Sequence, residues 1–134
     1  MKYLDDIIKT EDLILLNSYI IKSYDNYEVI NYCFYYACLN QKINVMDFLF
    51  ISFPDNLEFY YSGDPSLIAS SLGNLKTLKW LYNKSHIFPF NYEYILREAK
   101  SNNKTNVVKW MKSLKKDKDK QICPLYTTLK CKIL

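Results

Sequence analysis

Apolar side chains recur at helical spacing in short segments of the chain, and polar breaks separate these segments. The clearest pair of segments covers residues 65–72 and 75–83. One face of the second segment carries large residues three or four positions apart: Leu75, Leu78, Leu81 and Tyr82. The pattern predicts two short amphipathic helices with a two-residue turn between them.

The residues at the ends of these two segments are typical of helix boundaries. Asp64 offers a side-chain oxygen to the first turn, and the missing N–H of Pro65 costs nothing at a helix start. Gly73 and Asn74 tolerate the left-handed backbone that often ends a helix. The boundary residues therefore support the helix–turn–helix unit that the apolar pattern predicts.

The same unit recurs along the chain. Three alanines, Ala37, Ala69 and Ala99, are 32 and 30 residues apart. Nine positions after each alanine stands an apolar residue: Met46, Leu78 and Val108. The eleventh and twelfth positions hold an aromatic and then a large apolar residue: Phe48-Leu49, Trp80-Leu81 and Trp110-Met111. Repetition of several positions in phase predicts an array of helix pairs.

A weaker first copy precedes these three. With Leu4 in the alanine place, Leu13 and Leu16 fall at the ninth and twelfth positions. As a terminal unit it should keep its outer side wet, which its charged residues Lys2, Asp5, Asp6 and Lys9 would achieve. The other predicted helices cover residues 28–40, 44–52, 92–101, with Asn91 as N-cap, and 104–114.

The repeats resemble the ankyrin-repeat family, over roughly residues 3–114. The stretch 64–69, Asp-Pro-Ser-Leu-Ile-Ala, is similar to the family's Thr-Pro-Leu-His-x-Ala, with the proline and alanine matching and the histidine absent. Gly73 matches the family's glycine between the helices, whereas Gln41 and Asn103 replace it in other copies. The richness in Asn, Ile and Tyr resembles the ankyrin-like proteins of large DNA viruses.

The resemblance implies an all-α solenoid of about four helix pairs, with connectors that project to one side beside the inner helices. It also implies a non-catalytic scaffold that binds a protein partner, possibly of a host cell. A tetratricopeptide array has a similar period and is the rival fold. The proline that starts an inner helix and the short helices around Gly73 favour the ankyrin-like arrangement.

Charge divides the chain into two parts. The net charge of the 134 residues is +4, but residues 112–134 hold seven lysines and two aspartates, so the rest is close to neutral. We therefore expect a repeat domain over residues 1–114 and a lysine-rich tail over 115–134. Residues 115–120 read as a polar linker, and 121–134 as either a short capping helix or a disordered end.

Little in the sequence indicates catalysis or metal binding. One histidine, His86, and two glycines that are not clustered leave no catalytic triad and no phosphate-binding loop. The spacing of the cysteines fits no common zinc pattern and suggests free buried thiols: Cys33, Cys38, Cys123 and Cys131. We expect no catalytic, cofactor-binding or metal-binding residue, and no enzyme activity. The absence of a signal peptide or long apolar run suggests an intracellular protein, in the host cytoplasm if viral.

The candidate contacts with a partner are aromatic residues near the tips of two connectors, residues 53–63 and 84–91. Aromatic side chains are favoured anchors in protein interfaces. The candidates are Tyr60, Tyr61, Phe88, Phe90 and Tyr92. Their alternative role is to pack the connectors onto the helices.

A second function remains open: weak binding of nucleic acid or another anionic surface through the basic tail. Such binding would be lost between about 50 and 200 mM salt, because it depends on neutralised phosphates. The neutral repeat body gives little sign of a basic face, which makes a protein partner the leading expectation.

Overall fold

The computed structural model describes residues 2–58 and 60–121. These residues form eight α-helices, one 3-10 turn and no β-strand. The helices are α1 (Lys2–Thr10), α2 (Leu13–Lys22), α3 (Asn26–Leu39), α4 (Ile43–Ser52), α5 (Pro65–Leu72), α6 (Leu75–Asn83), α7 (Tyr92–Ser101) and α8 (Thr105–Gln121). The 3-10 turn, η1 (Pro54–Asn56), lies in the first connector. The expected all-α fold is confirmed for these residues.

The boundary residues act as the sequence predicts. The Asp64 carboxylate accepts a hydrogen bond from the backbone N–H of Ser66 at 2.9 Å, and Pro65 is the first residue of α5. Asn91 caps α7 by accepting from the N–H of Tyr94 at 3.1 Å. Each bond satisfies one of the donors that a helix start leaves without a partner. The predicted bounds of α5, α6 and α7 are therefore confirmed.

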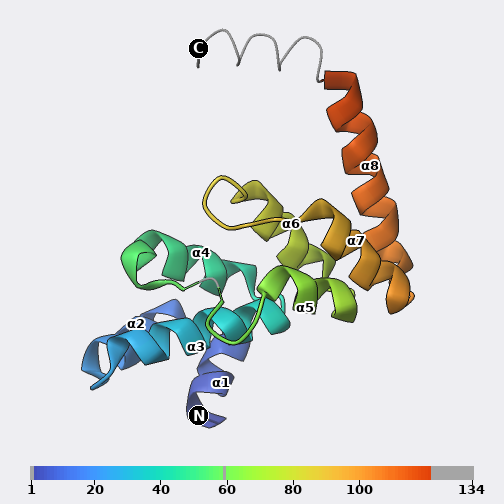
Figure 1. Ribbon diagram of the computed structural model, residues 1–134. Helices are drawn as coiled ribbons and strands as arrows, with labels where there is room; N and C mark the ends of the chain where they lie inside the picture. The colour runs from blue at the N-terminus through green and yellow to red at the C-terminus, as the bar shows by residue number, and fades with distance from the viewer. Residues whose placement is uncertain (1, 59, 122–134) are drawn as a thin grey trace, which may run out of the picture.

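Helices pack in consecutive pairs, α1 with α2, α3 with α4, α5 with α6 and α7 with α8. We call α1, α3, α5 and α7 the inner helices, because each contacts the next inner helix along the chain. The others are the outer helices. Among the described residues, the extensive contacts between pairs join neighbouring pairs, so that α1 and α8 lie at opposite ends of the molecule (Figure 1).

The four turns inside the pairs share one geometry. Each holds one residue with a left-handed backbone: Glu11, Gln41, Gly73 and Asn103, with φ between +55° and +76°. The next residue donates its N–H to a carbonyl five positions back, and those carbonyls belong to Ile7, Ala37, Ala69 and Ala99. These four residues therefore occupy equivalent places, which we call the alanine position.

This equivalence corrects the predicted register of the first copy. Ile7, and not Leu4, takes the alanine position, 30 residues before Ala37. Both are buried and three residues apart on one helix face, so the apolar pattern alone could not distinguish them. Leu16 then falls at the ninth position, where it is fully buried like Met46 and Leu78.

A ladder of hydrogen bonds connects each turn to the next outer helix. The Asn44 amide donates to the Glu11 carboxylate at 3.0 Å, and the N–H of Lys76 donates to the Gln41 side chain at 3.0 Å. The third bond runs from the Asn106 side chain to the carbonyl of Gly73, at 3.1 Å. Every bond joins the fourth residue after one alanine position to the seventh after the next. The pairs therefore contact each other in the same register three times.

The last helix departs from the sequence-based prediction. α8 extends to Gln121, so the polar linker expected at residues 115–120 is wrong. Lysine is a good helix former, and no glycine or proline interrupts the chain before Pro124, so nothing local ends the helix at Leu114. The capping helix or disordered end expected at 121–134 lies, except for Gln121, outside the described residues.

Candidate partner-binding surface

A buried asparagine of α3 attaches the first connector to the inner helices. The Asn31 side-chain amide donates to the carbonyl of Asn56 at 2.8 Å and to that of Tyr27 at 2.9 Å. Its side-chain oxygen accepts from the N–H of Glu58 at 2.7 Å. Sequence reasoning missed this residue, although a polar side chain between the apolar residues Ile30 and Cys33 is a signal that something buried needs a partner.

Two tyrosine–carboxylate hydrogen bonds then join this connector to the start of α3. The Tyr27 hydroxyl donates to the carboxylate of Glu58, and the Tyr61 hydroxyl donates to that of Glu28. Desolvation raises the pKa of Tyr61 to about 12, with the hydrogen bond to Glu28 and nearby negative charge adding to the shift. The Tyr61 hydroxyl therefore keeps its proton, and its role as a donor, at neutral pH.

We call Tyr27, Glu28, Glu58, Tyr60 and Tyr61 the first-connector surface. Tyr60 is 58 % exposed, Tyr27 is also exposed, and Tyr61 is half-buried. Asp25 and Asp55 are exposed on the same helix start and connector, so acidic side chains accompany the tyrosines. The arrangement offers aromatic faces next to carboxylates, a combination that suits contact with basic and apolar side chains.

The second connector is packed against the molecule. Phe88 is only 5 % exposed, and its ring lies 5.8 Å from that of Phe34 and 5.9 Å from that of Phe50. Phe90 lies between the rings of Tyr82 and Trp110, at 5.3 and 6.3 Å. These contacts match the alternative role that the sequence left open, and they correct Phe88 in particular, because its buried ring offers almost no surface to a partner.

Tyr92 also faces the protein, since its hydroxyl donates to the carbonyl of Met111 in α8 at 2.8 Å. The five predicted site residues therefore divide between two places. Tyr60 and Tyr61 belong to the first-connector surface, whereas Phe88, Phe90 and Tyr92 pack around α6 and α8. That any of the five binds a partner stays a prediction.

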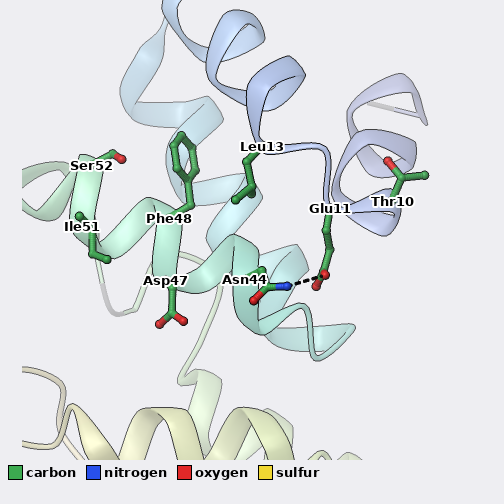
Figure 2. Close-up of a pocket in the computed structure, with 8 residues that line it drawn as sticks. All are labelled: Thr10, Glu11, Leu13, Asn44, Asp47, Phe48, Ile51 and Ser52. Atoms are coloured by element: carbon green, nitrogen blue, oxygen red, sulfur yellow. Dashed lines mark hydrogen bonds between the residues drawn. The ribbon is translucent and has the colours of Figure 1, made fainter.

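A hollow of about 540 Å³ lies between the start of α2 and α4 (Figure 2). Its polar groups already have partners. The Asn44 amide donates to Glu11, as the dashed line in Figure 2 shows, and the carboxylate of Asp47 accepts from the indole N–H of Trp80 at 2.6 Å. Phe48 and the exposed Ile51 complete the lining. The hollow thus holds no acid–base pair of the kind that hydrolysis needs.

Neither described cysteine is suited to chemistry. Cys33 and Cys38 are free and buried, and burial raises the pKa of Cys33 to about 12 and raises that of Cys38 further. A thiol must lose its proton to react or to bind a metal. Within residues 2–58 and 60–121, no group of three or more His, Cys, Asp or Glu side chains could hold a metal ion.

No helix in the described part of the chain is long and apolar enough to cross a membrane. Comparison of the chain with protein-family models, with curated proteins and with solved structures gives no match.

Proposed function

We propose that the chain is an ankyrin-like array of four helix pairs that acts as a non-catalytic scaffold for a protein partner. The support for the array is the repeated turn geometry and the ladder that joins Glu11 to Asn44, Gln41 to Lys76 and Gly73 to Asn106. Units that contact their neighbours in one register build a long surface for binding.

The first-connector surface is the proposed binding site. Its support is a single observation: two hydrogen bonds, from Tyr27 to Glu58 and from Tyr61 to Glu28, hold exposed tyrosines beside carboxylates. Side chains that are already held lose little conformational freedom on binding, so more of the contact energy remains as affinity. The neighbouring acids favour a partner segment that presents lysine or arginine beside apolar side chains.

The partner that we would seek first is a protein of the host cell cytoplasm, because the chain resembles the ankyrin-like proteins of large DNA viruses. This choice rests on the resemblance in sequence character, and the binding surface does not depend on it.

The test is affinity capture from host-cell lysate with the full chain, Tyr60→Ala and Ile51→Ala. Ile51 is a matched control, since it is 77 % exposed on the outer helix α4 and lies outside the proposed surface. We expect one protein to be retained at high salt by the full chain and by Ile51→Ala, and retention to fall at least about tenfold with Tyr60→Ala, as for an interface anchor.

Equal retention by Tyr60→Ala and the full chain would place binding elsewhere. Capture of nucleic acid that is lost between about 50 and 200 mM salt would instead support the alternative, a weak anionic-surface binder. That alternative draws on the lysines of α8, which include Lys109, Lys112 and Lys115.

A further inference from the structure

The two ends of the stack differ in the chemistry that they expose. The residue four before each alanine position faces the preceding helix pair in the later units. Cys33 and Ile95 are fully buried there, and Pro65 is buried as well. The first pair has nothing before it in the structure, and its equivalent residue, Tyr3, is 61 % exposed.

A second equivalent place shows the same contrast on the outer helices. Eight residues after the alanine position stand Val45, Thr77 and Val107, all fully buried. Leu15 holds that place in α2 and is 39 % exposed. The positions that a preceding pair would cover are therefore apolar and exposed in the first pair.

The rim of this end has changed in the same direction. Asn44, Lys76 and Asn106 stand at the seventh position, where each donates the bond of the ladder to the preceding turn. The equivalent residue in α2 is Ile14, which is 87 % exposed and has no polar atom in its side chain. We call Tyr3, Ile14 and Leu15 the N-terminal end face.

The charges expected to keep this end wet do so only in part. Asp5 is half-buried and accepts a hydrogen bond from the Tyr32 hydroxyl of α3, so it faces the next pair. Asp6 and Lys9 are exposed, and they place opposite charges on one helix. The end face thus consists of apolar residues with a mixed-charge border.

The opposite end carries charged residues at equivalent places. The residue after the alanine position is fully or almost fully buried in the first three pairs, as Ile8, Cys38 and Ser70. In the last pair it is Lys100, which is exposed. Lys100 lines a hollow of about 330 Å³ together with Asn103, Val108 and Lys109. This end has the polar outer face that a terminal repeat needs in water.

We propose that the N-terminal end face binds the same face of a second copy of this chain, forming a two-fold symmetric dimer. Within one chain these positions are the ones that a helix pair of this kind covers. A head-to-tail contact would press Tyr3 and Leu15 against Lys100 and Lys109, and burying unpaired ammonium groups is costly. Pairing the two apolar faces avoids that cost, and a two-fold axis can bring Asp6 near Lys9 of the other copy.

The test is sedimentation velocity of the full chain over about 1–200 µM, the range in which a small interface associates. We expect monomer and dimer in exchange, with no larger species. Ile14→Glu and Tyr3→Glu place like charges across the two-fold axis, and each should weaken the dimer at least tenfold. Ile51→Glu puts the same charge on another exposed isoleucine and should leave the dimer unchanged.

A full chain that stays monomeric over the whole range overturns the proposal. Growth beyond the dimer overturns the two-fold arrangement, because a head-to-tail contact does not close. Equal loss with Ile51→Glu would indicate a general effect of charge. Circular dichroism of each variant checks the fold, and since Ile14 is largely exposed we expect its replacement to unfold nothing.

Discussion

Asn31 shows how much one buried side chain can organise at the residue scale. It bonds to a carbonyl and an N–H of the first connector and to its own helix, so it keeps the proposed binding surface next to α3. A buried polar group that is fully paired rigidifies its surroundings, whereas an unpaired one is costly. The position of Tyr60 and Tyr61 therefore depends on a residue that contacts neither side chain through these bonds.

Replacing Asn31 by alanine should lower the free energy of unfolding by about 1–3 kcal/mol, because connector backbone groups lose their partners. Asn40→Ala is the matched control, since the Asn40 side chain is exposed and donates only to the carbonyl of Tyr36 on its own helix. Denaturant unfolding measures both. An equal loss in the two variants would show that the connector does not depend on Asn31.

Phe88 is a residue whose role the sequence left undecided. An aromatic residue in a loop can bind a partner or cover the core, and both need the same side chain. The choice depends on Phe34, Phe50 and Trp80, which lie 54, 38 and 8 residues away in the chain and meet only in the folded protein. Local pattern carries no record of that meeting.

The element scale explains which predictions succeeded. α5 and α7 begin with strong side-chain caps, Asp64 and Asn91, and their bounds were predicted correctly. α8 lacks a local stop signal, and its extension to Gln121 was missed. The first pair was predicted three residues out of register, since a helix face repeats every three to four residues and Glu11 is an unusual residue for a left-handed turn.

The four left-handed turn residues provide a prediction at this scale. Gly73→Ala should lower the free energy of unfolding by about 1–2 kcal/mol, because φ is +76° there and an L side chain is strained. The new Cβ would also lie 3.1 Å from Cδ of Lys104. Asn103→Gly removes a side chain from the equivalent turn and serves as the control.

Thermal and denaturant unfolding compare the two turn variants. We expect Asn103→Gly to keep or slightly raise stability, since φ is +57° in that turn and glycine adopts it without strain. If Gly73→Ala were as stable as the unchanged chain, the turn would have another geometry and the equivalence of the four turns would fail.

At the scale of the whole molecule, the account rests on repetition. The alanine positions, the left-handed turns and the ladder recur with the same spacing, although their side chains differ from pair to pair. The sequence predicted the period from Ala37, Ala69 and Ala99, yet it could not predict the ladder. Glutamate, glutamine and glycine serve there in turn, and in the glycine case the backbone carbonyl is the acceptor.

The ends of the molecule and its first connector then suggest two separate contacts. One would place a basic, apolar partner segment on the first-connector surface, and the other would join two copies through Tyr3, Ile14 and Leu15. The two proposals use different residues, so that Tyr60→Ala and Ile14→Glu test them independently.

The most direct test of the array is the stability of three variants: Ala37→Leu, Ala69→Leu and Ala99→Leu, compared by denaturant unfolding. All three alanines are buried where helices pack, and added methylenes should cost about 1–3 kcal/mol each. Lys79→Leu on the exposed side of α6 is the control, with a change within about 0.5 kcal/mol. Similar losses at all three alanines are the result that a repeated array predicts. A variant as stable as the control would contradict the equivalence of the helix pairs.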